Sequence, residues 1–91
     1  MDQTEPHVDL GLRFGQAVRR LREARAWSQE ELAAQAGLNR SYLGEIERAA
    51  AMPSLATAAK LSRALDVALS ALIAHCERQH EPACERPAQT A

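Results

Sequence analysis

A segment of ten residues near the middle of the chain carries seven hydrogen-bonding side chains at helical spacing. The segment 39–48 reads NRSYLGEIER, and its apolar positions, Leu43 and Ile46, leave the polar ones facing outward. Arg40 is the best suited of these to reading a base, because a guanidinium can donate to guanine O6 and N7 together and discriminate by roughly 1–3 kcal/mol. Ser41 can donate or accept at a base edge, and Glu45 can accept from cytosine N4. The residues that we place on this outward face are Asn39, Arg40, Ser41, Gly44, Glu45 and Arg48.

Gly44 lies among these side chains although a glycine inside a helix costs roughly 0.5–1 kcal/mol relative to alanine. Its presence indicates a steric reason, and we expect it to permit a close approach to DNA.

A second set of reactive side chains lies near the end of the chain. Cys76 and His80 are four residues apart, on one face of a helix, and Cys84 with His75 could complete a metal site. A zinc- or redox-responsive switch is therefore one reading of this segment. Because the spacing fits no common zinc module, we favour the other reading, a frayed helix end with reduced thiols, and predict no metal and no cofactor. We also find no nucleophile–base arrangement and no phosphate loop, so we predict that the protein is not an enzyme.

The elements that must position segment 39–48 are indicated by the spacing of residues 29–48. Counted from Gln29, the fifth residue is Ala33, which is small enough for two helices to cross closely, and the ninth is Gly37, which can turn the chain with a positive φ. Five further positions are apolar or small and face inward: Leu32, Ala36, Leu38, Leu43 and Ile46. This arrangement is typical of two short helices joined by a tight turn, a helix-turn-helix.

Three further helices complete the prediction. The first runs from near Leu12 to Ala26, with Phe14, Val18 and Leu21 on one face. Ser28 and Glu31 form a capping box for the second helix, and Asn39 caps the third. Pro53-Ser54 opens the fourth, and the fifth begins near Leu69. The buried stripe expected on the fourth helix is Leu55, Ala58, Leu61 and Leu65, and the apolar residues of the fifth helix are Leu72, Ile73 and Cys76.

Size and charge favour one small domain between acidic ends. The 91 residues carry a formal net charge of −1, yet nine cations oppose six anions between residues 10 and 75. We therefore predict a flexible arm (1–9), a folded domain (10–76) and a C-terminal tail (77–91). Neither a signal peptide nor an apolar run of membrane-spanning length is present, so we expect a cytoplasmic protein.

The chain resembles the lambda-repressor-like, Cro/C1-type (XRE) helix-turn-helix family of bacterial and phage regulators. The matching segments are LRFGQAVRRLREARAWSQEELA, AGLNRSYLGEIER and PSLATAAKLSRALDVALSALI, which together run from about residue 12 to residue 73. The resemblance implies an all-α, compact five-helix domain with flexible tails. It also implies a sequence-specific DNA-binding transcriptional regulator, a repressor or an activator, whose third helix (39–48) reads the major groove.

The resemblance also assigns roles to individual residues. Those implied to contact bases are Asn39, Arg40, Ser41, Gly44 and Glu45, and those implied to contact phosphates are Gln29, Tyr42 and Arg48. Tyr42 is equally compatible with a half-buried packing residue. Arg22 and Glu47 occupy the positions at which similar proteins pair an arginine of the first helix with a glutamate of the third. We therefore predict a structural ion pair there.

The sequence departs from the family pattern at two places. The loop after the third helix reads Ala49-Ala50-Ala51-Met52, in which the alanines favour one more helical turn, and Ala68 is a poor cap for the fifth helix. Regulators of this type bind paired half-sites, so we expect a homodimer on a two-fold-symmetric operator, formed through the fifth helix with Ile73 and Leu69 exposed for the partner copy. Both residues are also compatible with a place in the core. The alternative is an antitoxin or adaptor whose helix-turn-helix domain also binds a protein partner through the tails.

Overall fold

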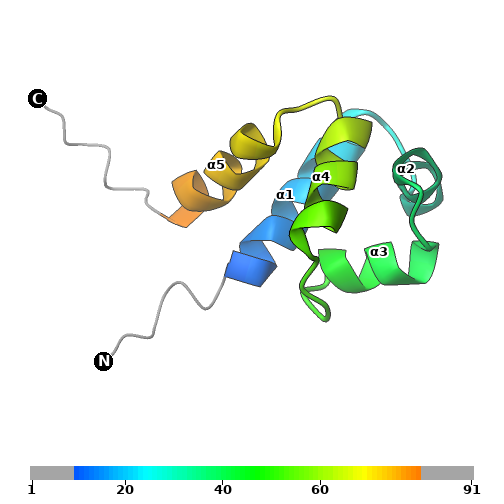
Figure 1. Cartoon of the computed structure of the whole chain (residues 1–91), viewed down its shortest axis with the longest axis horizontal. Coiled ribbons are helices and arrows are strands. Elements are labelled where there is room, and N and C mark those ends of the chain that lie inside the picture. Colours follow the sequence, from blue (N-terminus) through cyan, green and yellow to red (C-terminus); the bar gives the residue numbers. More distant parts are fainter. Residues whose placement is uncertain (1–9, 81–91) are drawn as a thin grey trace, which may run out of the picture.

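The computed structural model describes residues 10–80, and these form five α-helices without a strand. The helices are α1 (Leu10–Ala24), α2 (Gln29–Ala36), α3 (Arg40–Glu47), α4 (Leu55–Ala64) and α5 (Leu69–His80). Figure 1 shows α1 and α4 in the middle, α2 and α3 together on one side and α5 on the other. The all-α, five-helix prediction is confirmed. The predicted arm (1–9) and residues 81–91 of the predicted tail lie outside the described residues, and α5 continues past residue 76 to His80.

A single apolar core draws side chains from every helix. Leu32, Leu43 and Ile46 of the helix-turn-helix are fully buried, and so are Leu61 and Leu72 of the last two helices. The complete core is Phe14, Ala17, Val18, Leu32, Ala33, Ala36, Leu43, Ile46, Ala58, Leu61, Leu65, Leu72 and Cys76. Because α3 contributes two side chains to this core, its remaining face has a fixed direction relative to the rest of the domain.

Leu55 does not belong to the core, so the prediction for this residue is wrong. Its side chain is 76% exposed, whereas Ala58 and Leu61 on the same helix are buried. Leu55 is the first residue of α4, and the first turn of this helix contains no buried residue. Helical periodicity places Leu55 on the buried stripe, but the contact with the core begins only one turn later.

The helix caps follow the sequence closely. The Ser28 hydroxyl accepts from the Glu31 backbone N–H at 3.0 Å, and the Glu31 carboxylate accepts from the Ser28 backbone N–H at 2.8 Å. Asn39 Oδ1 accepts from the backbone N–H groups of Ser41 and Tyr42. Both predicted N-caps of the helix-turn-helix are therefore confirmed, and they fix where α2 and α3 begin.

Four of the helices, α1 to α4, are each followed within two residues by a residue with a left-handed backbone. These residues are Ala26, Gly37, Ala49 and Asp66, with φ between 59° and 70°. After each of them, the next N–H donates to the carbonyl five residues earlier, which is a Schellman motif (Trp27 to Arg22, Leu38 to Ala33, Ala50 to Glu45, Val67 to Ser62). Two sequence predictions are thereby corrected. The first helix stops at Ala24 instead of Ala26, and no extra helical turn forms at residues 49–51.

Candidate nucleic-acid interface

The outward face of α3 presents a compact group of polar side chains. Arg40, Ser41, Glu45 and Arg48 are all exposed. Asn39 is exposed too, but its side-chain oxygen Oδ1 accepts the two hydrogen bonds of the helix cap. Of its side-chain amide, the NH2 group is therefore left to contact a ligand. The N-cap and the first turn of α3 therefore expose an amide NH2 group, a guanidinium and a hydroxyl at three consecutive residues.

Arg22 and Glu47 form a buried, bidentate ion pair between α1 and α3. Arg22 Nε lies 2.8 Å from Glu47 Oε2, and Arg22 Nη2 lies 3.0 Å from Glu47 Oε1. The two side chains are only 11% and 3% exposed. The hydrogen bonds that Arg22 donates to the Glu47 carboxylate raise the pKa of the Arg22 guanidinium. A third Arg22 nitrogen donates to the carbonyl of Trp27 at 2.8 Å, which ties the turn before α2 to the same pair.

Gln29, the first residue of α2, links this ion pair to the surface of α3. Its Nε2 donates to Glu47 Oε1 at 3.0 Å, and its Oε1 accepts from Arg40 Nη1 at 3.4 Å. Residues from three helices, which are far apart in the sequence, thus form one chain of hydrogen bonds. Arg40 lies at its outer end and Arg22 at its inner end.

Gly44 is buried, although we expected it on the outward face. A Cβ at this position would lie 3.3 Å from Arg48 Nη1 and 3.6 Å from Gln29 Oε1. The side chains that cover Gly44 are therefore those of the protein itself. The steric reason for this glycine is that it leaves room for the side chains of Gln29 and Arg48 over α3.

Tyr42 and Arg48, the other predicted phosphate contacts, differ in their surroundings. Tyr42 is half-buried and packs against the core, whereas Arg48 is exposed at the end of α3. The structure thus brings Gln29 and Arg48 together over Gly44, joins Arg40 to Gln29 by a hydrogen bond, and leaves Tyr42 at the edge of the core.

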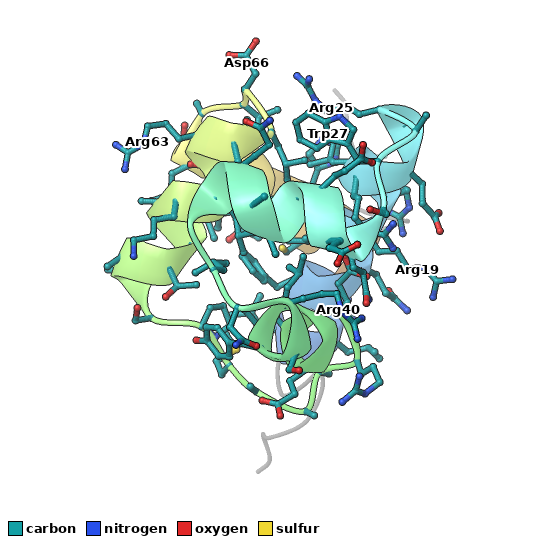
Figure 2. All side chains as sticks on the ribbon, turned by 90° about the vertical axis from the view of Figure 1, so that its right-hand side faces the viewer. Arg19, Arg25, Trp27, Arg40, Arg63 and Asp66 are labelled. Atoms are coloured by element: carbon teal, nitrogen blue, oxygen red, sulfur yellow. The ribbon has the colours of Figure 1, made fainter. Side chains whose placement is uncertain are left out.

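Two features outside this face were not anticipated from the sequence. The first is a stack of the Arg25 guanidinium over the Trp27 ring, 5.0 Å from its centroid, in which Arg25 Nη2 also donates to the Leu65 carbonyl at 3.1 Å. Figure 2 shows Arg25, Trp27 and Asp66 above α2 and Arg40 below it. The stack therefore joins the turn before α2 to the end of α4, away from Arg40.

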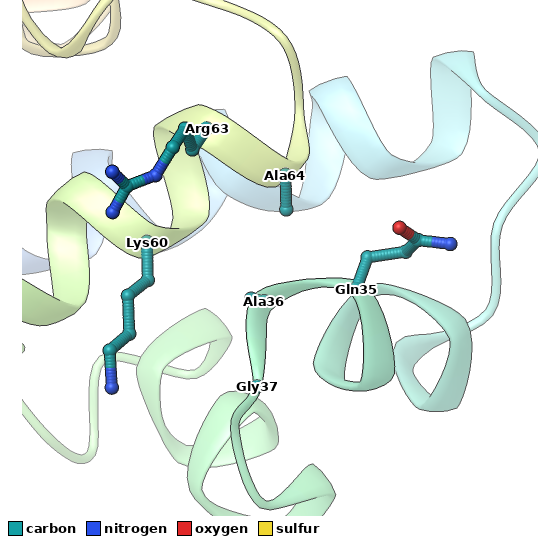
Figure 3. Close-up of a pocket in the computed structure, with 6 residues that line it drawn as sticks. All are labelled: Gln35, Ala36, Gly37, Lys60, Arg63 and Ala64. Carbon is teal, nitrogen blue, oxygen red and sulfur yellow. The ribbon is translucent and has the colours of Figure 1, made fainter.

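The second is an open hollow of about 370 Å³ between the end of α2 and α4. Figure 3 shows Lys60 and Arg63 extending from α4 on one side of it and Gln35 from α2 on the other. Since it lies at the opposite end of α2 from Gln29, the hollow is separate from the group of side chains over Gly44.

The cysteine and histidine segment is only partly described. Cys76 is buried in the core, where its thiol donates to the Leu72 carbonyl at 3.4 Å and burial raises its pKa. Among the side chains that the structure describes, those of residues 10–77, no three from His, Cys, Asp or Glu gather as a metal site, and the side chain of His80 is not among them. Cys84 lies outside the described residues. None of the five helices within residues 10–80 is long and apolar enough to span a membrane.

Residues 18–72 match the helix-turn-helix family, which covers more than half of the chain. The chain belongs to this family. In the crystal structure of the restriction-modification controller protein C.AhdI from Aeromonas hydrophila, 97% of the chain superposes on 71% of this protein, with a TM-score of 0.67 and 46% sequence identity. Both the fold and the sequence therefore agree with a helix-turn-helix regulator, a class that binds DNA.

Two sequence relatives differ in how much of their length is shared. The control protein C.MunI of Mycoplasma sp is 36% identical over 72 residues, which cover 78% of this chain and 97% of that protein. The immunity repressor protein of Bacillus phage phi105 is 41% identical over 59 residues, which cover 65% of this chain but only 41% of the repressor. The likeness to the phage repressor is thus confined to part of that protein, whereas the likeness to the control protein extends over nearly all of it.

Proposed function

We propose that this protein binds a two-fold-symmetric DNA operator as a homodimer and that the first turn of α3 enters the major groove. The observation that carries this proposal is the placement of Arg40, Ser41 and the Asn39 NH2 group together at the exposed start of α3, in a chain of the helix-turn-helix family. The similarity to C.MunI and C.AhdI over 97% of each favours a control protein that regulates transcription. Such a protein would act in the cytoplasm and without catalysis.

The base contacts would be made by three side chains of α3. Arg40 keeps four of its five N–H groups after donating to Gln29, which is enough for a bidentate contact with guanine O6 and N7. Ser41 and Glu45, one helical turn apart, would read the neighbouring positions. The NH2 group of Asn39 would donate to a base or to the backbone beside it.

The phosphate contacts would come from the start of α2 and from the end of α3. The first N–H groups of α2 and its helix dipole favour an anion, and Gln29 Nε2 keeps one N–H after donating to Glu47. Arg48 is exposed at the other end of the same surface, and Tyr42 could donate its hydroxyl from the edge of the core. These groups would fix the register of α3 without reading sequence.

The homodimer would form through α5. This helix packs mainly against α1, and its outward positions include Ser70, Ala71 and Glu77, whereas Leu69 and Ile73 are half-buried against the core. Small residues at positions 70 and 71 would allow two copies of α5 to approach closely. The two copies would then place their α3 helices about one turn of DNA apart.

The division of roles can be tested with two arginine variants and a panel of operator duplexes that differ by single base pairs. Arg40→Ala should relax specificity at one position of each half-site, at a cost of about 1–3 kcal/mol for the preferred base. Arg48→Ala should weaken binding to every duplex alike and lower the salt dependence by about one ion per site. An equal loss on all duplexes for Arg40→Ala would refute its role in base recognition.

A further inference from the structure

We infer that Glu47 is a positioning residue for Arg40 and that it acts through the amide group of Gln29. The inference rests on the proposed function for its meaning in DNA recognition. Its structural basis is the chain of hydrogen bonds from Arg22 through Glu47 and Gln29 to Arg40.

The first step is that Glu47 determines which end of the Gln29 amide faces inward. A carboxylate can only accept hydrogen bonds, and this one already accepts two from Arg22. Its side chain is 3% exposed, so water has little access to compete for its oxygens. The group that approaches Glu47 Oε1 must therefore be a donor, and Gln29 places its NH2 there at 3.0 Å.

The second step follows from the geometry of an amide. With its NH2 turned toward Glu47, Gln29 must turn its oxygen toward the surface, where Arg40 Nη1 donates to it at 3.4 Å. Arg40 is the first residue of α3, at the positive end of the helix dipole, where a cation is disfavoured. The amide oxygen of Gln29 supplies a partner of the sign that this cation requires.

The third step concerns the space over α3. The missing side chain of Gly44 leaves room for the Gln29 amide, whose oxygen would lie 3.6 Å from a Cβ at position 44. The amide thus lies between the buried carboxylate and the exposed guanidinium. Binding to DNA then costs less side-chain conformational entropy, because Arg40 is already restricted in the free protein.

Gln29→Lys separates positioning from phosphate binding. A lysine at this position can still donate to Glu47, but it offers no acceptor to Arg40 and it adds a cation near the DNA. Because Gln29 is itself a proposed phosphate contact, the measurement is the ratio of affinities for duplexes that differ only at the base pair read by Arg40, and not the overall affinity. We expect this ratio to fall by about threefold or more, the range typical of coupled neighbours, whereas a change in phosphate binding alone would alter the affinity for all duplexes equally and leave the ratio unchanged. Gln35→Lys is the matched control, because it makes the same change at an exposed position of the same helix.

The role of Glu47 itself requires a variant that still folds. Removal of Glu47 alone would leave Arg22 charged and buried, whereas replacing both residues by apolar ones of similar size is often tolerated. In Arg22→Met/Glu47→Leu the Gln29 amide loses its inward acceptor. We expect this double variant, if its helical content matches the parent, to lose the same discrimination as Gln29→Lys. Should it not fold, Gln29→Lys and the measurement below decide the question.

A measurement without DNA makes the inference independent of the proposed function. NMR relaxation of the Arg40 guanidinium in the free protein should show restricted motion in the parent and in Gln35→Lys, and free motion in Gln29→Lys. Equal motion in all three proteins, or full discrimination by Gln29→Lys, would overturn the inference. If the parent selects no DNA site while Arg40 is restricted only in the parent and the control, the proposed function fails and the positioning of Arg40 stands.

Discussion

Four of the helices are followed by a residue with a left-handed backbone, and exchanging glycine and alanine at two of these residues should change the free energy of unfolding in opposite directions. Ala49 adopts a φ of 64° and Gly37 a φ of 70°, in the same hydrogen-bonded motif. This conformation costs a residue with a Cβ roughly 1–2 kcal/mol, a cost that glycine does not have. Glycine in turn loses roughly 0.5–1 kcal/mol more through conformational entropy on folding, which offsets part of that advantage. Ala49→Gly should therefore stabilise the protein by about 0.5–1 kcal/mol.

Gly37→Ala should destabilise the protein by a similar amount. No atom lies within 4 Å of a Cβ built at this position, so the backbone conformation is the only cost. For a domain of this size, each kcal/mol shifts the midpoint of thermal unfolding by roughly 4–8 °C. Urea and thermal unfolding followed by circular dichroism would measure both variants, with Ala50→Gly as the control because Ala50 has no positive φ. If Ala49→Gly lowers stability as Ala50→Gly does, the assigned conformation of the helix end is refuted.

Three further predictions concern other parts of the molecule. Gly15→Ala should destabilise the domain by about 1–3 kcal/mol in urea unfolding, because the added Cβ would meet the carbonyl oxygens of Ile46 and Glu47, the latter at 2.8 Å. Unchanged stability would contradict this close contact of α1 with α3. Burial raises the pKa of the Cys76 thiol, so alkylation of Cys76, measured by mass spectrometry of its peptide, should remain slow in the native protein. The stability of the fold should also fall as the pH rises through the ordinary thiol pKa of about 8.5, because the thiol ionises first in the unfolded state. Rapid native alkylation would show that the thiol is accessible. Ala71→Glu should shift the protein from dimer to monomer in analytical ultracentrifugation without a loss of helicity, and an unchanged dimer would exclude this face of α5 as the interface.

The features that could be predicted from the sequence are those that depend on a few neighbouring residues. The caps at Ser28 and Asn39 and the turn at Gly37 each require a particular residue type at one position, and the structure has all three. The ends of α1 and α3 could not be predicted in this way. Ala26 and Ala49 carry no local signal for a left-handed backbone, and alanine on its own favours a longer helix.

The parts of the candidate site that escaped prediction depend on contacts between helices. Gln29 is 18 residues from Glu47 and 11 from Arg40, so no local pattern links them. The position of Gly44 indicated a steric reason, but only the structure shows that Gln29 and Arg48 are the side chains concerned. The Arg22–Glu47 pair was inferred from the family resemblance, and its spacing alone would not have suggested it.

The most direct test of DNA recognition is selection of the full chain against a random duplex pool at physiological salt with excess competitor DNA. The proposed function predicts enrichment of a site with two-fold symmetry, whose half-sites lie about 10 base pairs apart, and Arg40→Ala should relax one position in each half-site. A protein that is folded by circular dichroism but enriches no site would contradict it, and would instead favour a role in binding a protein partner.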